Sequence, residues 1–361
     1  MHYGKNLSQR VKRTYLVFLG AGASIPIGFP GSAKLVNTFM SELTKTQESD
    51  KRKMLAMVRR LEKLILNNGF SYDSESLYSC LEGYSTPSKW MQQSGPFPSS
   101  MCKIQPVTKI RPDPFCNRLR SLFEEFLVTK FYNEDPFLKR RIKVIYNRLF
   151  SKISGVADWK NSEPDWASST FEVFTTNFDR AVETYSDQVN QAICMGYRIA
   201  EDNRVMFTPD DYEHNPASLK LYKLHGSVEL SALDDDTIIS QLPPAVPGQT
   251  YKRKSIVSKV MVYGIQKNII SEPYFELLAI FKKRLTELKR CLVIGYSFRD
   301  PWINQIFLDI IRNYPKMVNI ELVGRKKETK IAGLPTLNKV VIQKSSMLEK
   351  FLELPTQGAV A

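Results

Sequence analysis

The sequence has few cysteines, and no two of them are spaced as a metal-binding pair. Its 361 residues include five cysteines, at positions 80, 102, 116, 194 and 291, and none forms a C-x-x-C motif. An odd number of scattered cysteines is not typical of a disulfide framework, and the lack of close pairs argues against a cysteine zinc site. Long apolar runs are missing too: none approaches membrane-spanning length, and residues 1–6 lack the apolar core of a secretory signal. We therefore expect a cytoplasmic, globular protein with no membrane segment and no bound metal.

Acidic residues are outnumbered by basic ones, which raises the question of a nucleic-acid partner. The net charge is +14, and basic runs occur at 51–53, 139–141, 282–284 and 325–327. Several of these runs fall on the polar side of amphipathic stretches, and no aromatic residues interleave them as a base-stacking surface requires. A solvated helix face is the better interpretation, and a nucleic-acid or acidic-protein partner stays open. The acidic run 234–236 lacks the glycine spacing of a calcium loop and is interpreted as an exposed loop.

Apolar runs that end in polar or glycine-rich turns indicate the fold. They are interpreted as strands; the third alternates with lysines, which predicts one less buried face. Helical spacing of apolar residues between the strands predicts core-facing helices. Strands alternating with helices predict an α/β fold, a doubly wound, Rossmann-like, mostly parallel sheet with a helical insertion after the first strand-helix unit. The strands are expected at 15–19, 171–176, 219–224, 291–294 and 318–323, and apolar helix stripes at 54–65, 119–127 and 278–288.

The length of 361 residues allows one large domain or two ordinary ones, and no internal repeat is apparent. We expect residues 1–361 to make a single unit, with 32–170 as a largely helical insertion. Within the insertion, residues 83–114 carry six prolines and many serines, too broken for regular structure and long for an idle loop. A lid, an oligomer contact and disorder all remain open for this segment.

Polar clusters follow the predicted strands, and a doubly wound sheet would gather them at one edge. Gly20 and Gly22 allow a tight turn and close approach to a ligand, where free backbone N–H groups stabilise anions, and Ser24 can cap a helix or donate to phosphate. Each cluster also has an ordinary explanation. Asn177 and Asp179 suit a helix cap, His225 can bond nearby backbone, and Asp300 or Ser297 can cap a helix that starts at Pro301. Five such clusters at one edge favour a ligand site over five separate coincidences.

The motifs and their order resemble a known family. Gly20-Ala-Gly-Ala-Ser24, Thr175-Thr-Asn-Phe-Asp179, Leu224-His-Gly-Ser227 and Gly295-Tyr-Ser297 together resemble the sirtuin NAD-dependent enzymes. The stretch 294–304, Ile-Gly-Tyr-Ser-Phe-Arg-Asp-Pro-Trp-Ile-Asn, looks more like the sirtuin-like NADases of bacterial antiphage defence systems. The resemblance covers residues 13–330, although 32–170 match only in being helical and in an acidic helix start near Asp73 and Glu75.

The resemblance implies roles for individual residues. Asn177 would position the nicotinamide ribose and an attacking water, His225 would be the general base, and Asp179 would steady the Asn177 loop. The glycine turn would hold the NAD pyrophosphate, and the turns after the last two strands would bind the adenosine half. The residues implied to contact NAD are Gly20, Ala21, Gly22, Ala23, Ser24, Thr176, Asp179, Gly226, Gly295, Tyr296, Ser297 and Gly324.

Departures from the protein-deacetylating sirtuins bear on the substrate. Those enzymes carry two C-x-x-C pairs after the histidine, whereas only Cys291 follows His225 here, so zinc is not expected. Thr176 and Phe178 replace the residues that flank the asparagine in the deacetylase motif, which puts an acyl-peptide channel in doubt. Water is then the simplest nucleophile, and hydrolysis of NAD to ADP-ribose and nicotinamide is the leading hypothesis, with a cyclic product as a variation. A protein deacylase or ADP-ribosyltransferase, and a non-catalytic nucleotide-sensing or nucleic-acid-binding subunit, are the alternatives.

An enzyme that depletes NAD must be held inactive, and no sensor domain is apparent in these residues. By the resemblance, its trigger would act in trans, through self-assembly into a homo-oligomer or through a partner. Such a partner would be a hexameric DNA-translocating ATPase of the HerA type or an Argonaute-like protein, which would also supply any contact with nucleic acid.

Overall fold

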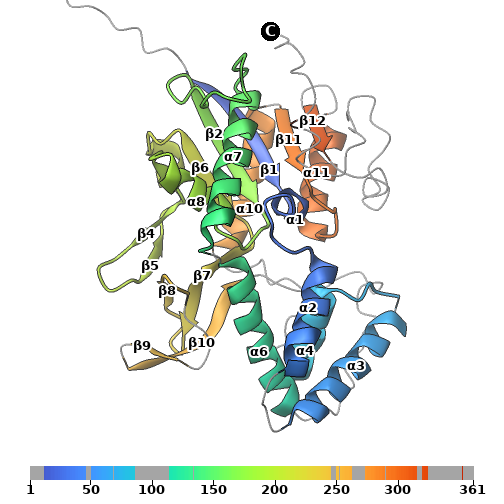
Figure 1. Ribbon diagram of the computed structural model, residues 1–361. Helices are drawn as coiled ribbons and strands as arrows, with labels where there is room; N and C mark the ends of the chain where they lie inside the picture. The colour runs from blue at the N-terminus through green and yellow to red at the C-terminus, as the bar shows by residue number, and fades with distance from the viewer. Residues whose placement is uncertain are drawn as a thin grey trace, which may run out of the picture.

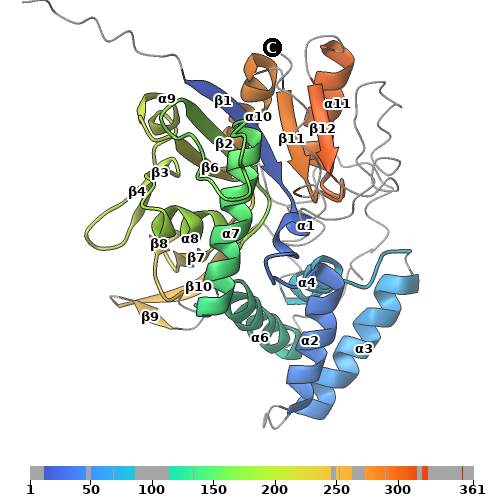
Figure 2. The same cartoon turned by 45° about the horizontal axis from the view of Figure 1, so that its top comes forward.

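A parallel sheet lies at the centre of the molecule, with helices on both of its faces and a bundle of helices at one end (Figures 1 and 2). Of the proline- and serine-rich segment, residues 86–113 lie outside the part described, as does Gly324. The computed structural model describes residues 12–45, 50–67, 69–85, 114–132, 134–244, 249–251, 253–261, 273–288, 290–314, 319–323 and 352.

The central sheet contains all five predicted strands, and every pairing in it is parallel. The predicted α/β class and the mostly parallel, doubly wound sheet are therefore confirmed. A sixth, two-residue strand at one edge was not predicted, because two residues carry no periodic pattern. In order across the sheet the strands are β12 (Asn319–Val323), β11 (Arg290–Ile294), β1 (Arg13–Leu19), β2 (Ser169–Thr175), β6 (Leu219–Lys223) and β3 (Ile193–Cys194).

Alternate residues of each strand feed two separate apolar clusters. Leu16 and Phe18 of β1 join the cluster beneath one pair of helices, while Val17 and Leu19 join the cluster on the opposite face. Side chains of a strand point alternately to its two faces, so a strand that is apolar throughout needs cover on both. That cover comes from α7 (Pro136–Ile153) and α8 (Ala181–Gln188) on one face, and from α10 (Tyr274–Leu288) and α11 (Pro301–Asn313) on the other (Figure 1).

The prediction of a less buried face at 219–224 is wrong. Every residue of β6 is buried, including Lys220 and Lys223. The Lys220 ammonium donates to the backbone carbonyl of Tyr212, and Lys223 is neutralised by Glu183. Buried lysines are tolerated when they are paired in this way, so the alternation reflects internal partners and not a solvent-facing side.

A bundle of four helices forms a third apolar cluster at the carboxyl end of the sheet. Phe178, from the loop after β2, and Val228, just beyond His225, belong to this cluster. The bundle therefore packs directly on the loops that carry the predicted site, and the helix stripes predicted at 54–65 and 119–127 face its core. Its members are α2 (Ser32–Lys45), α3 (Lys51–Asn67), α4 (Ser74–Ser85) and α6 (Pro114–Phe131).

Shorter strands complete the described part of the chain. An antiparallel sheet joins β8 (Ile238–Ser240), β7 (Gly226–Leu233), β10 (Lys254–Met261) and β9 (Thr250–Tyr251), and a hairpin pairs β4 (Tyr197–Ile199) with β5 (Val205–Phe207). Two four-residue helices are α1 (Ala21–Ser24) and α9 (Asp211–His214). The acidic run 234–236 is exposed, as predicted. None of the described helices is both long and apolar enough to cross a membrane.

Candidate active site

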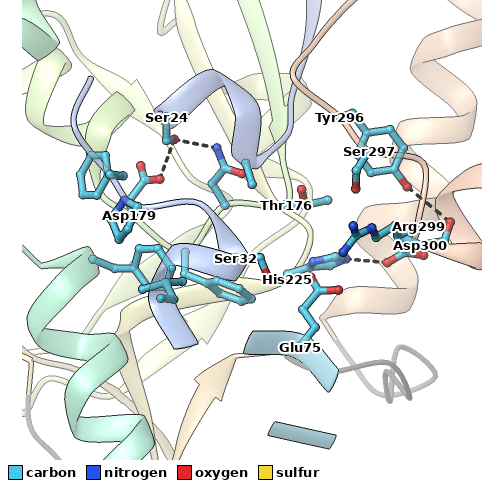
Figure 3. Close-up of a pocket in the computed structure, with 17 residues that line it drawn as sticks. Ser24, Ser32, Glu75, Thr176, Asp179, His225, Tyr296, Ser297, Arg299 and Asp300 are labelled. Carbon is cyan, nitrogen blue, oxygen red and sulfur yellow. Dashed lines mark hydrogen bonds and ion pairs between the residues drawn. The ribbon is translucent and has the colours of Figure 1, made fainter. Parts of the chain in front are cut away.

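Four strands end in register, which brings the predicted polar clusters together. Leu19 of β1 is level with Thr175 of β2 and with Ile294 of β11, and Thr175 is level with Lys223 of β6. The residues that follow these positions therefore meet at one edge, beside β1, where the strand order reverses. A pocket lies there (Figure 3), and the predicted residues that line it are Ala21, Ser24, Thr176, Asn177, Asp179, His225, Tyr296 and Ser297.

Five further predicted residues lie nearby without lining the pocket: Gly20, Gly22, Ala23, Gly226 and Gly295. The backbone N–H groups of the glycine turn were expected to be free, but three of them already donate to backbone carbonyls. The Gly20 amide donates to the Ile294 carbonyl, that of Gly22 to the Gly295 carbonyl and that of Ala23 to the Gly20 carbonyl, at 2.8–2.9 Å. These amides are used to hold the turn together.

Close packing of two backbones explains the glycines of this turn. Gly295 has a φ of +64°, and a Cβ there would lie 2.3 Å from the Ala23 nitrogen. A Cβ on Gly20 would lie 2.5 Å from the Tyr296 Cα, and one on Gly22 2.8 Å from the Gly295 Cα. The turn after β1 and the turn after β11 thus touch through backbone atoms alone. Only glycine permits both this approach and the left-handed conformation at 295.

Asn177 is held in a defined orientation with one atom unsatisfied. Its Nδ2 donates to the Gly20 carbonyl at 3.1 Å and to the Ser24 hydroxyl at 2.9 Å, and its backbone amide donates to Thr175 Oγ1 at 3.0 Å. A carbonyl only accepts, so the contact with Gly20 fixes which end of the amide is the nitrogen. Asn177 is 8% exposed, and its Oδ1 is buried without a hydrogen-bond partner. A buried orphan acceptor in a pocket is suited to a ligand's donor group.

Ser24 links Asn177 to Asp179, and Figure 3 shows the contact between Ser24 and Asp179. The Ser24 hydroxyl accepts from Asn177 and donates to Asp179 Oδ2 at 2.8 Å, so it neither caps a helix nor points to a phosphate in this structure. The other Asp179 oxygen accepts from the Ala181 amide at 3.0 Å, at the start of α8. Burial raises the pKa of Asp179, against the lowering effects of Lys223 and of the Ser24 hydrogen bond.

His225 and Asp300 both line the pocket and lie side by side in it (Figure 3). The distance from His225 Nε2 to Asp300 Oδ2 is 2.9 Å, and the side chains are 4% and 2% exposed. Asp300 Oδ1 also accepts from the Trp302 and Ile303 amides, at 2.9 and 3.1 Å, and Pro301 is the first residue of α11. The interpretation of Asp300 as a helix cap is confirmed. Its contact with the histidine was not predicted.

Lys223 is a second supporting residue whose role was not predicted. Its ammonium donates to the Asp179 carbonyl and to Glu183 Oε1, both at 2.7 Å, and to the Ser227 hydroxyl at 3.0 Å. A second buried ion pair, Arg180 with Glu229 at 2.6 Å, lies beside it. Lys223 therefore ties the loop after β2 to the segment that carries His225. Its place two residues before the histidine, at the end of a strand, is the signal that could have marked it.

The remaining lining residues come from the helical bundle, from the segment before α2, from the loop after β2 and from the turn after β11. Phe29, Pro30, Leu35, Phe131 and Phe178 give the pocket an apolar wall. Ser32, Glu75 and Arg299 add polar groups at the rim, and Arg299 pairs with Asp73, which caps α4 through the Ser76 amide. Among the lining residues that the structure describes, Arg299 is the one lysine or arginine. Over the described residues, no group of three or more His, Cys, Asp or Glu side chains could hold a metal ion.

Comparison with known proteins finds a known domain over part of the chain that lines this pocket. The family model of the SIR2-like domain matches residues 172–332. A solved Sir2–p53 peptide–NAD+ complex is 13% identical over 94% of this chain and 90% of that one, with a TM-score of 0.41. A Sir2 homologue mutant bound to ADP-ribose is 11% identical over 97% and 94%, also with a TM-score of 0.41. No curated protein matches the sequence. Residues 172–332, which include Asn177, His225 and Asp300, therefore match a SIR2-like domain.

Proposed function

We propose that this protein hydrolyses NAD at the bond between nicotinamide and ribose, giving ADP-ribose and nicotinamide. The observation that supports it is the orphan Oδ1 of Asn177 in the same pocket as His225, within a SIR2-like domain. Of the two sirtuin structures compared above, one is a complex with NAD+ and the other a complex with ADP-ribose.

The reaction needs positioning and a base more than a strong acid. The C–N bond breaks as positive charge develops on the ribose, and nicotinamide leaves as a neutral molecule. In our proposal the Asn177 Oδ1 accepts a hydrogen bond from the attacking water or from a ribose hydroxyl. His225 removes a proton from that group, and the sum is NAD+ plus water giving ADP-ribose, nicotinamide and a proton. A positioned general base contributes typically about 10²-fold to 10⁴-fold.

The dinucleotide would be bound by the residues that reach the pocket. We propose that Ala21, Thr176 and Ser297 contact NAD directly. Gly20, Gly22, Ala23 and Gly295 would act through the backbone packing that shapes the turn. Gly226 continues from His225 into β7, and Tyr296 packs in the core with its hydroxyl donating to the Asp300 carbonyl at 3.3 Å. Asp179 would keep Asn177 in place through Ser24.

Water is the proposed nucleophile because the features of an acyl-peptide site are missing from the sequence. Only one cysteine follows His225, so the paired cysteines of the protein-deacetylating sirtuins have no counterpart. We further propose a role in antiphage defence, with NAD depleted on activation by self-assembly or by an ATPase or Argonaute-like partner. This part of the proposal is supported by the resemblance of residues 294–304 to the defence NADases.

The test is nicotinamide release from NAD by the purified full chain, followed by chromatography, with and without neighbouring gene products. Asn177→Ala and His225→Ala should each abolish release without unfolding the chain. His214→Ala is the matched control, because that histidine is exposed and its ring contacts the Asp210 carbonyl outside the pocket. Release that requires an acceptor peptide or protein would instead support a deacylase or transferase. Absence of release under every condition, including phage infection of expressing cells, would refute the proposal.

A further inference from the structure

We propose that Asp300 is a positioning residue that fixes the proton of His225 on Nε2 and leaves Nδ1 as the basic nitrogen. The expected effect on catalysis rests on the proposed function, but the contact between His225 and Asp300 does not depend on the substrate. The two side chains meet at 2.9 Å between Nε2 and Oδ2, and both are almost completely buried.

The orientation of the carboxylate is fixed independently of the histidine. Its Oδ1 accepts from the amides of Trp302 and Ile303, at the start of a thirteen-residue helix that begins with Pro301. These two bonds leave Oδ2 directed at the ring (Figure 3). A side chain that caps a helix and holds a histidine has little rotational freedom, so the imidazole receives a rigid partner.

The tautomer follows from what each group can donate. A carboxylate accepts hydrogen bonds only, so the ring nitrogen that faces it carries the proton. In neutral imidazole the second nitrogen is then the acceptor, which makes Nδ1 the atom that can take a proton from the reacting hydroxyl or water. When Nδ1 takes that proton, the imidazolium lies beside a carboxylate, which stabilises its positive charge. The proton leaves to solvent after nicotinamide has departed, and Asp300 stays unprotonated throughout.

The chain supplies a matched control for the capping role of Asp300. Asp135 caps α7 in the same way: its Oδ1 accepts from the Phe137 amide at 3.0 Å, and Pro136 is the first residue of the helix. Asp135 is exposed and does not line the pocket. Asparagine is about as good a helix cap as aspartate, so Asp300→Asn and Asp135→Asn should both keep their helices. A difference between the two variants then reports on the histidine and not on the cap.

The experiment is nitrogen NMR of the full chain labelled with 15N-histidine at pH 8, together with steady-state kinetics. The chain has three histidines, so His225→Ala assigns the signals. We expect wild type and Asp135→Asn to show His225 protonated on Nε2 and unprotonated on Nδ1. In Asp300→Asn this pattern should be lost, because an amide can also donate to Nε2. In that variant kcat for nicotinamide release should fall by about 10²-fold or more while KM changes little, as for other histidines that lose an orienting carboxylate.

The outcomes separate this inference from the proposed function. A wild-type His225 that carries its proton on Nδ1, or on both nitrogens, would overturn the inference whether or not the protein hydrolyses NAD. An unchanged His225 spectrum in Asp300→Asn would also overturn it and leave Asp300 as a helix cap only. If the wild-type protein releases no nicotinamide under any condition, the proposed function fails. The NMR pattern expected above would still support the placement of the proton by Asp300.

Discussion

Replacement of Lys223 by methionine should destabilise the fold strongly, because it leaves a carboxylate buried without its cation. Lys223 and Glu183 are 7% and 4% exposed and 2.7 Å apart. Removal of one partner of a buried ion pair costs about 3–5 kcal/mol, whereas an exposed pair contributes about 0–1 kcal/mol. The carbonyl of Asp179 and the hydroxyl of Ser227 would lose a donor as well. We therefore expect Lys223→Met to lower the free energy of unfolding by about 3–5 kcal/mol.

Two companion variants separate the charge from the packing. Lys223→Met combined with Glu183→Leu removes both charges and should recover part of the loss, since a buried pair can be replaced by apolar side chains at little cost. Lys282→Met breaks an exposed pair with Asp309, 3.1 Å apart, and should change stability by less than about 1 kcal/mol. The assay is urea unfolding followed by tryptophan fluorescence.

The pH dependence gives a second, independent reading of the same substitution. Burial raises the pKa of Glu183 even in the wild-type chain, although Lys223 opposes the shift. Without Lys223 the folded-state pKa should rise further above that of the unfolded chain. Stability that depends on a protonated carboxyl is present at low pH and is lost as the pH rises through the folded pKa. The deficit of Lys223→Met should therefore grow from pH 5 to pH 8. A cost below about 1 kcal/mol, or a double variant no more stable than the single one, would refute the reasoning.

Two further predictions concern the pocket. Gly295→Ala should lower the free energy of unfolding by more than about 2 kcal/mol, because a Cβ there would lie 2.3 Å from the Ala23 nitrogen and the backbone is in a left-handed conformation. Gly155→Ala should cost less, since Gly155 has a φ of +77° but open space around it. Equal losses of stability in urea unfolding would contradict the packing argument. Asp179→Asn should become more stable relative to wild type as the pH rises from 4 to 7, because a raised carboxyl pKa costs stability as the group ionises. Asp309→Asn should show the opposite slope, and at a pH below about 4, since the Lys282 hydrogen bond lowers the pKa of Asp309; urea midpoints at each pH would measure both effects.

The sheet could be predicted from the sequence because its signals are local. Each of the five predicted strands is a mostly apolar run of about four to six residues closed by a turn, and such runs pair where helices cover both faces. The meeting of Asn177 with His225 followed from topology alone, since parallel strands place their carboxyl ends at one edge. The strand β3 and the sheet of β7 to β10 give no comparable signal. Their pairing depends on contacts made elsewhere in the fold.

The two supporting residues could not be predicted, because their roles depend on partners distant in the sequence. Lys223 finds Glu183 forty residues earlier, and Asp300 contacts His225 from seventy-five residues later. Locally, Lys223 has the pattern of a half-exposed strand and Asp300 that of a helix cap. Both local interpretations are physically sound. The helix cap at Asp300 is present in the structure, but its contact with His225 has no local signal. A sequence pattern shows which positions are polar, but not whether a polar side chain is buried and paired with an ionic partner.

Lys223 and Asp300 stabilise different parts of the pocket. Asn177 is oriented by Gly20 and Ser24 at the end of β1, and its loop is anchored by Lys223 at the end of β6. His225 is oriented instead by a carboxylate from the turn after β11. The sheet fixes where each backbone ends, since four strands stop in register. It does not fix the side-chain rotamers, which need partners that are themselves immobile. Those partners are backbone carbonyls and buried ionic groups, whose hydrogen bonds are costly to leave unmade and therefore specify one arrangement.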